Sequence, residues 1–307
     1  MIAKTPQGMK HLMSPRDLFL ALLPPILWAV GYSFGKGALL HFQPLFTTAM
    51  MYAIAGVILF RPSAGLKTPW VWLILISVFG AGLQSALIFY GVAQVDTSLA
   101  NLVVQAQVPC AILAAWALGL ERLNPLRMAG VALAILGIAV VVGWPKPGGV
   151  YVGLICILGG TASWGLGQAL IRKHSRDAIR QLVGGMSLMA APQLLAVSLL
   201  VETDHIGRLT SGSAYEWFGL ALLSVGSFVV AYLLWYGLLE RNRMDQVAPF
   251  ALLMPLVGMF NGVVFFGETL TKGFLLGAAL VLSGLVLTII ARDARVRASL
   301  EMNSAAS

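Results

Sequence analysis

Ten apolar runs follow one another along this chain, with mostly short polar connections between them. Each run is close in length to the roughly 20 residues that a helix needs to cross a bilayer. Backbone N–H and C=O groups find no partners in lipid, so such runs must be helical. We therefore predict an all-α integral membrane protein with ten transmembrane helices. The runs are 18–40, 44–60, 69–93, 97–119, 125–143, 150–171, 181–201, 214–239, 244–266 and 273–291.

The composition supports this prediction, because the chain lacks the charge that a water-facing surface needs. Of its 307 residues, 10% are charged and 59% are hydrophobic, whereas soluble domains carry about 25% charged residues. The net charge of +8 arises from basic residues in short loops. That distribution indicates topology rather than a nucleic-acid partner. Both cysteines, Cys110 and Cys156, lie inside apolar runs, so we expect no disulfide framework.

The basic residues also orient the chain. Ten spans put both termini on one side, and 16 of the 20 basic residues lie on that side. Because positively charged loops are enriched on the cytoplasmic side, we predict a cytoplasmic N-terminal tail (1–17) and a cytoplasmic C-terminal tail (292–307). The four basic residues on the other side are Lys36, Lys146, Arg208 and Lys272.

The sequence pattern of the first half returns 146 residues later in the second half. We therefore predict two five-helix repeats, 18–143 and 150–291. Because five is odd, the second repeat is inverted relative to the first, which is the architecture of alternating-access carriers with a cargo site near the midplane. The corresponding residues are Tyr90-Gly91 and Tyr236-Gly237, Pro109 and Pro255, and, with a one-residue slip, Glu121 and Glu268.

The fourth span carries polar groups near the middle of the membrane. Asn101 and Gln105 share one face of an uninterrupted helix, whereas Gln107 points roughly the other way. Proline has no N–H and removes a helical hydrogen bond, so we predict hinges at Pro109 and its counterpart Pro255. The amides either join helices to one another or contact a cargo, and Asn101 and Gln105 are the candidate contacts.

Aromatic residues and one further amide on the first, third, sixth and eighth spans are additional candidates for cargo contact. Aromatic rings offer flat apolar walls, and tyrosine or tryptophan adds one polar group. Packing between helices is the alternative role. These candidates are Trp28, Tyr32, Tyr90, Trp164, Gln168, Tyr232 and Trp235.

The corresponding residues Glu121 and Glu268 are the carboxylates of most interest. No Asp or Glu occupies the middle of any span. Glu121 precedes Asn124 and Pro125, which form an N-cap and a first-turn proline. Glu268 precedes the matching cap residue Thr271. A carboxylate at such a place stabilises the positive end of the helix that follows. The alternative role for both residues is gating or proton handling.

The sequence contains no catalytic cluster. Its four histidines lie in loops or tails, and it has neither an HExxH motif nor a credible nucleotide-binding fingerprint. We expect no enzymatic activity, no metal and no cofactor, so transport would have to use a gradient. The expected partners are the lipid bilayer and a small-molecule cargo, with a homodimer as a further option.

Two long segments resemble the EamA-type drug/metabolite transporters. The segment similar to the first half of these transporters is FYGVAQVDTSLANLVVQAQVPCAILAAWALGLERLNPLRMAGVALAILGIAVVV. The segment similar to their second half is VAPFALLMPLVGMFNGVVFFGETLTKGFLLGAALVLSG. The likeness extends from about residue 18 to 291. Within the family, LANLVVQAQ and VAPFALLMPLVG are most similar to the O-acetylserine/cysteine exporter branch, from which Pro109-Cys110 departs. The resemblance implies efflux of small amino-acid metabolites across a bacterial inner membrane.

Three hypotheses about function remain open from the sequence. The first is a secondary or facilitative transporter that exports small amino acids or related metabolites, such as cysteine or O-acetylserine, by alternating access. The second is a carrier of other cargo, such as aromatic amino acids, toxic organic compounds or sugars. The third is a membrane protein that handles lipid or has a regulatory role and transports no soluble cargo.

Overall fold

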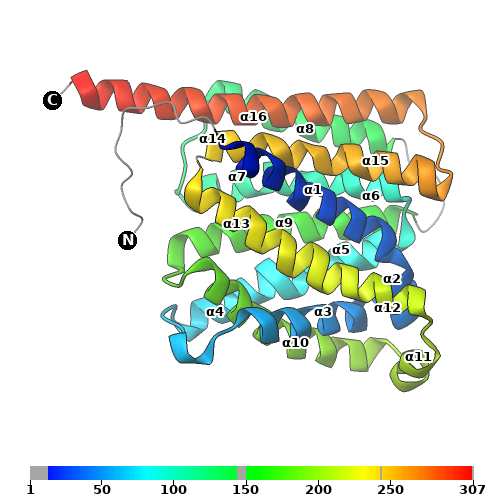
Figure 1. Ribbon diagram of the computed structural model, residues 1–307. Coiled ribbons are helices and arrows are strands. Elements are labelled where there is room, and N and C mark those ends of the chain that lie inside the picture. The colour runs from blue at the N-terminus through cyan, green and yellow to red at the C-terminus, as the bar shows by residue number, and fades with distance from the viewer. Residues whose placement is uncertain (1–12, 144–149, 243, 306–307) are drawn as a thin grey trace.

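The computed structural model describes residues 13–143, 150–242 and 244–305, which form a bundle of helices lying mostly side by side (Figure 1). Within these residues, nine helical segments are long and apolar enough to cross a membrane. A tenth is obtained if α2 (Lys36–Phe42) and α3 (Pro44–Leu59), which meet at 114°, count as one span. The prediction of an all-α integral membrane protein is confirmed.

The remaining elements follow the predicted runs closely. The first half contains α1 (Pro15–Phe34), η1 (Pro62–Ala64), α4 (Trp70–Ser77), η2 (Val78–Gly82), α5 (Leu83–Gln94), α6 (Thr97–Val103), η3 (Val104–Ala106), α7 (Gln107–Ala117) and α8 (Pro125–Val142). The second half contains α9 (Val150–His174), α10 (Ile179–Val201), α11 (His205–Ser211), α12 (Ala214–Ala221), η4 (Leu222–Val230), α13 (Ala231–Arg241), α14 (Met244–Val247), η5 (Ala248–Leu252), α15 (Leu253–Phe266) and α16 (Lys272–Ala305).

Polar side chains begin several of these helices by accepting hydrogen bonds from first-turn N–H groups that have no partner within the helix. The predicted caps Asn124 and Thr271 are both confirmed. The bonds run from the Arg127 N–H to Asn124 Oδ1 (2.7 Å), from the Phe274 N–H to Thr271 Oγ1 (3.2 Å) and from the Asp17 N–H to Ser14 Oγ (3.1 Å).

The first span differs from the predicted run 18–40. It begins at Pro15, within the predicted tail, because Ser14 caps it, and it ends before Gly35. Lys36 therefore does not lie in the outer part of this span. It begins α2, and its Nζ donates a hydrogen bond at 2.7 Å to the carbonyl of Val95, the C-cap residue of α5. At the other terminus, α16 continues through the predicted tail to Ala305.

Equivalent spans of the two halves deviate from the α-helix at equivalent places. The third and eighth spans contain the π-helical segments η2 and η4, which are often found at functional sites. The fourth and ninth spans contain the 3₁₀ segments η3 and η5, and each segment lies just before a predicted hinge proline, Pro109 or Pro255. A 3₁₀ stretch inside a helix often marks a hinge, so the predicted hinges coincide with real irregularities.

The two halves meet along α8 and α16 through reciprocal glycine contacts. A Cβ added at Gly130 would lie 2.9 Å from the Gly284 carbonyl oxygen, and one added at Gly137 would lie 2.7 Å from that of Gly277. In the repeat, Gly130 corresponds to Gly277 and Gly137 to Gly284. Such reciprocity is what a two-fold axis between antiparallel helices produces, and it supports the inverted-repeat interpretation.

Charged residues separate between the two ends of the bundle. Helices α7 and α16 end and α1 begins at the same end (left in Figure 1). Because Glu121 follows α7 in the chain, we call it the Glu121 end. At the opposite end α15 ends, α2 and α16 begin and α11 lies. These elements bring Lys36, Arg208, Lys272 and Glu268 there, and we call it the Glu268 end. This agrees with the predicted segregation of charge, while the assignment of the Glu121 end to the cytoplasm stays a prediction. Residues 1–12, Lys146 and Arg243 lie outside the described residues.

Candidate functional site

Two adjoining cavities lie between the spans. The larger has a volume of about 490 Å³ and the smaller a volume of about 120 Å³. The larger extends to the Glu121 end, and the smaller lies among α1, α3, α5 and η4. Five side chains line both cavities and form their common boundary: Trp28, Gln107, Trp164, Trp235 and Tyr236.

Aromatic rings form most of the wall of the smaller cavity. The ring of Trp28 lies edge-on to Tyr232 at a centroid distance of 5.7 Å, and 5.4 Å from the ring of Trp235. Phe228 packs on Tyr232 at 4.9 Å. Each such pair contributes about 0.5–1.5 kcal/mol beyond the burial of its area, so this wall is already ordered without a ligand. Trp28 Nε1 is buried and has no hydrogen-bond partner among the described residues, which leaves a donor for a bound molecule.

A short polar chain lies in the same wall, contributed by the second and third spans. The Tyr52 hydroxyl and Ser85 Oγ are 2.7 Å apart, and Ser85 Oγ donates to Gln84 Oε1 at 2.9 Å. None of these three residues is among the contacts predicted from the sequence. The signal that could have found them is the adjacent pair Gln84-Ser85 inside an apolar run, because polar groups at membrane depth are costly and often functional.

The structure places seven of the nine predicted contact residues on the cavity walls. Gln105 and Gln168 line the larger cavity, and Gln105 is only 3% exposed. Tyr32 and Tyr232 line the smaller cavity, while Trp28, Trp164 and Trp235 line both.

Asn101 and Tyr90 do not line either cavity. Asn101 is fully buried between α6 and α15, and its Nδ2 donates to the Thr97 carbonyl at 3.0 Å. Tyr90 is 45% exposed on α5. The adjacent Gly91 packs so closely on α9 that a Cβ there would lie 2.6 Å from Ile157, which turns Tyr90 outward.

Gln107 has a larger part in the site than its predicted orientation indicated. The prediction that it points away from Gln105 assumed an uninterrupted α-helix. The 3₁₀ segment η3 separates the two residues and changes the rotation per residue from that of an α-helix. Both amides therefore reach the larger cavity, and Gln107 reaches the smaller one as well.

The Glu268 end of the bundle is closed by contact between α6 and α15. A Cβ at Gly258 would overlap Asn101, and one at Gly262 would overlap Ser98. The Glu268 carboxylate completes the contact by accepting hydrogen bonds from the N–H groups of Thr97 (2.6 Å) and Ser98 (2.9 Å). None of these residues lines either cavity.

The equivalent crossing at the Glu121 end is open. There α7 faces η5 across the larger cavity, which both elements line. The residues of α7 that correspond to Gly258 and Gly262 are Ile112 and Trp116, so the glycines of the closed crossing have no counterpart here. Ile112 lies on the cavity wall. The described protein is thus closed at one end and open toward the other.

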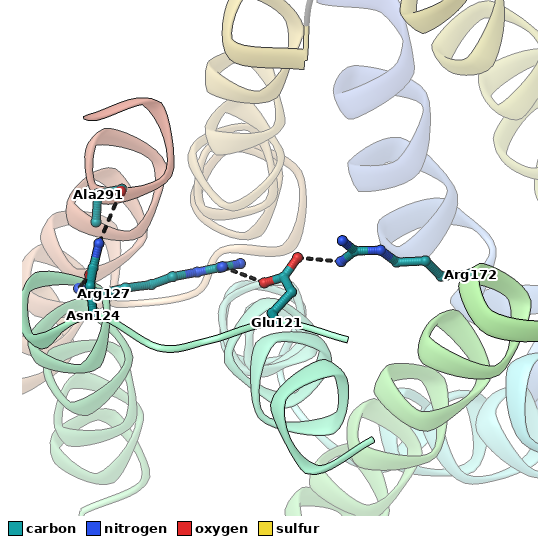
Figure 2. A network of polar contacts seen from close by, with 5 residues as sticks. All are labelled: Glu121, Asn124, Arg127, Arg172 and Ala291. Atoms are coloured by element: carbon teal, nitrogen blue, oxygen red, sulfur yellow. Dashed lines mark hydrogen bonds and ion pairs between the residues drawn. The ribbon is translucent and has the colours of Figure 1, made fainter. Parts of the chain in front are cut away.

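Glu121 lies between two arginines at this open end (Figure 2). Its carboxylate forms ion pairs with Arg127 of α8 and with Arg172 in the last turn of α9. Burial of the Glu121 carboxyl raises its pKa, but hydrogen bonds and charges from Arg172 and Arg127 outweigh this effect, so its pKa lies below the ordinary value. Glu121 is therefore ionised at neutral pH.

The hydrogen bonds of the two carboxylates go to groups outside the first turns of α8 and α16, the helices that follow them in the chain. One first-turn N–H of α8 binds Asn124, and one of α16 binds Thr271. Glu268 caps α6 of the other half, and Glu121 binds the two arginines. The predicted stabilisation of the helices that follow Glu121 and Glu268 stays a prediction.

The cavity-lining residues that were not predicted fall into three groups. Arg127 and Arg172 have only the pattern of topology signals, because arginines in loops are common in membrane proteins. Tyr52, Gln84 and Ser85 have the polar-pair signal described above. The others carry no distinguishing pattern. Groups of three or more His, Cys, Asp or Glu that could hold a metal ion do not occur in the described parts of the chain. The missed residues include Arg127, Arg172, Thr288, Tyr52, Gln84, Ser85 and Phe89.

The model of the EamA-like transporter family matches residues 16–143 and again residues 151–290. A relative from Salmonella typhimurium, named a probable amino-acid metabolite efflux pump, is 32% identical over 92% of this chain and 99% of its own length. An S-adenosylmethionine/S-adenosylhomocysteine transporter from Chlamydia trachomatis is 24% identical, covering 87% of each chain.

A solved crystal structure shares the fold. It superimposes with a TM-score of 0.61 at 19% sequence identity, covering 92% of this chain and 99% of the other. At this level of identity the similarity concerns the arrangement of helices alone.

Proposed function

Because the chain belongs to the EamA-like transporter family, we propose that it exports small amino acids or related metabolites, such as cysteine or O-acetylserine, by alternating access. Transport is secondary or facilitative. The Glu121 end faces the cytoplasm of a bacterium, and the protein spans the inner membrane. The described conformation is then the one that accepts cargo from the cytoplasm.

The observation that carries this proposal is the difference between the two pseudo-equivalent crossings. Helices α6 and α15 close the Glu268 end with glycine contacts and a charged cap. The cavity of about 490 Å³ lies open between α7 and η5 at the Glu121 end. A carrier built from inverted repeats would reach the opposite conformation by exchanging the roles of the two crossings.

The size of the larger cavity favours a second class of cargo within the same function. Its volume of about 490 Å³ falls in the range of about 300–1,000 Å³ that is typical of sites for drug-sized ligands. Metabolites bulkier than cysteine would therefore fit. The relative named for transport of S-adenosylmethionine and S-adenosylhomocysteine is in line with this alternative.

Purified protein in liposomes tests the proposal. The interior would be loaded in turn with labelled cysteine, O-acetylserine, phenylalanine, S-adenosylmethionine and an organic cation, and the rate of release compared with that of protein-free liposomes. We expect release of at least one amino acid or amino-acid derivative to be saturable and at least tenfold faster with protein. Release of the organic cation alone would support other cargo, and no accelerated release of any compound would support a function other than transport.

A further inference from the structure

The charged side chains of the cavity walls are confined to one place. Of the described residues that line the two cavities, only Glu121, Arg127 and Arg172 are charged, and all three lie at the Glu121 end of the larger cavity. The remaining wall is made of amides, hydroxyls, aromatic rings and aliphatic side chains. A cargo entering this cavity meets its charges first and its aromatic rings at the far boundary.

These three residues leave one positive charge uncompensated. One carboxylate oxygen of Glu121 pairs with Arg127 Nη1 and the other with Arg172 Nη1. A single ionised carboxylate therefore faces two guanidinium groups, each of which has five N–H donors. A cleft whose charged groups carry a net charge of one sign attracts molecules of the opposite charge, so this end of the cavity favours a second negative charge.

Free donors remain on both arginines. Arg127 is only 12% exposed, and its Nε is buried without a hydrogen-bond partner among the described residues. Arg172 is 55% exposed at the cavity wall. Its guanidinium is bound to Glu121 through one nitrogen, so the rest of the planar group is available to a molecule in the cavity.

Asn124 fixes the main chain of Arg127 at the start of α8. The Arg127 N–H donates to Asn124 Oδ1 at 2.7 Å, and Asn124 Nδ2 donates to the Ala291 carbonyl of α16 at 3.3 Å (Figure 2). The Glu121 carboxylate holds the guanidinium of Arg127 and links it to that of Arg172 on α9. An ordered pair of guanidinium groups binds a planar carboxylate better than a mobile pair, because less side-chain entropy is lost.

We propose that Arg127 and Arg172 bind the carboxylate group of the cargo at the Glu121 end of the larger cavity, with Glu121 as their positioning residue. This inference rests on the proposed transport function and narrows its cargo to compounds that carry a free carboxylate. The apolar part of such a compound would extend toward Gln107 and the aromatic boundary.

The test compares a free acid with its methyl ester, in which a neutral ester group replaces the ionised carboxylate and the side chain is unchanged. Binding of cysteine, phenylalanine and their methyl esters to detergent-purified protein would be followed through tryptophan fluorescence, since Trp28, Trp164 and Trp235 line the cavities. Transport of the same compounds would be measured in liposomes. For the wild type we expect the acid to bind at least tenfold more tightly than the ester, a difference in binding free energy of about 1.4 kcal/mol. We also expect the acid to be transported faster than the ester.

The decisive variant is Arg172→Gln, because Arg172 is half exposed and its loss should leave the fold intact. The matched control is Lys173→Gln, which removes the same charge one residue away on an exposed side chain outside both cavity walls. We expect Arg172→Gln to weaken binding of the acid at least tenfold and to leave the ester unchanged, while Lys173→Gln alters neither.

Equal losses for acid and ester in Arg172→Gln would show a structural or gating role and overturn the inference, as would a wild type that does not prefer the acid. In either case the proposed transport function would stand if the wild type transports these compounds. A wild type that transports none of the compounds in this or the preceding panel would instead contradict the proposed function itself.

Discussion

The amide of Gln107 lies where the two cavities meet, and the amide of Gln105 faces the larger cavity alone. A polar group at this depth needs a partner, because lipid offers none. Gln105 Nε2 is 3.5 Å from the Asn101 carbonyl, at the outer limit of a hydrogen bond. Both side chains therefore have donors and acceptors available to a cargo.

We expect Gln107→Leu to lower transport tenfold or more, and Gln105→Leu to lower it by a smaller factor. Loss of a hydrogen bond to the cargo that contributes about 1.4 kcal/mol lowers transport tenfold. Hydrogen bonds between membrane helices average well below that value. Transport at matched protein levels measures the effect. Gln94→Leu is the control, because Gln94 is outside both walls and, among the described residues, its side chain donates to the Tyr90 carbonyl of its own helix. Near-full transport by both cavity variants would place the cargo elsewhere.

Glu268 and Glu202 form a matched pair for a second prediction. Glu202 caps α3 through the N–H groups of Leu45 and Phe46, each at 2.9 Å, just as Glu268 caps α6. Hydrogen bonds to charged groups contribute about 1.5–3 kcal/mol, and glutamine keeps only one of the two acceptor oxygens.

Glu268→Gln and Glu202→Gln should therefore lower the unfolding temperature in detergent by similar amounts. Only Glu268 holds the closed crossing, so only Glu268→Gln should also change the rate of transport. If both variants lose transport equally, the cap on α6 has no special part in the conformational cycle.

At the scale of elements, the crossing of α6 and α15 depends on the absence of side chains. A Cβ added at Gly258 would overlap Asn101, which has no free space because it is fully buried. At Gly273, in the first turn of α16, the nearest atom to an added Cβ is Thr271 Oγ1 at 4.0 Å. The two glycines thus allow one substitution to be compared in a crowded and an open place.

We expect Gly258→Ala to slow transport severalfold and to admit water to the Glu268 end, because α15 must move away from α6. Gly273→Ala should have no such effect. Alanine favours helix over glycine by about 1 kcal/mol, so any loss in Gly258→Ala reflects the contact rather than helix propensity. Reactivity of a cysteine placed at Ser98 toward a thiol reagent would report the opening. An unchanged reactivity would show that the closed crossing tolerates a methyl group.

The elements also show how far sequence could predict this protein. Span positions were predictable, because bilayer thickness fixes the length of an apolar run. The π-helical segments η2 and η4 were not, because they depend on contacts between distant residues. Gly31, for example, lies against Ser227 of η4, whose Oγ donates to the Leu27 carbonyl at 2.6 Å. For the same reason the role of Gln107 could not be predicted, because it follows from the 3₁₀ segment η3. Nor could the pairing of Arg127 and Arg172 through Glu121.

At the scale of the whole molecule, the segregation of basic residues predicts that the Glu121 end faces the cytoplasm. A reporter fused after Ser307 should therefore be active in the cytoplasm. A cysteine at Ser211, which is exposed in α11 near the Glu268 end, should react with a membrane-impermeant thiol reagent from outside, in a background that lacks Cys110 and Cys156. Labelling of Ser211→Cys from the cytoplasmic side would reverse the orientation and, with it, the direction of the open cavity.

Alternating access itself is tested most directly by a single cysteine in the larger cavity. Ala251 of η5 lines that cavity on the side facing α7. In vesicles of known orientation, Ala251→Cys should react with an impermeant thiol reagent from the cytoplasmic side when no cargo is present, and from the outer side only when transported cargo drives the conformational cycle. Equal reactivity from both sides without cargo would indicate an open channel, and no reactivity from the cytoplasmic side would contradict the open cavity described above.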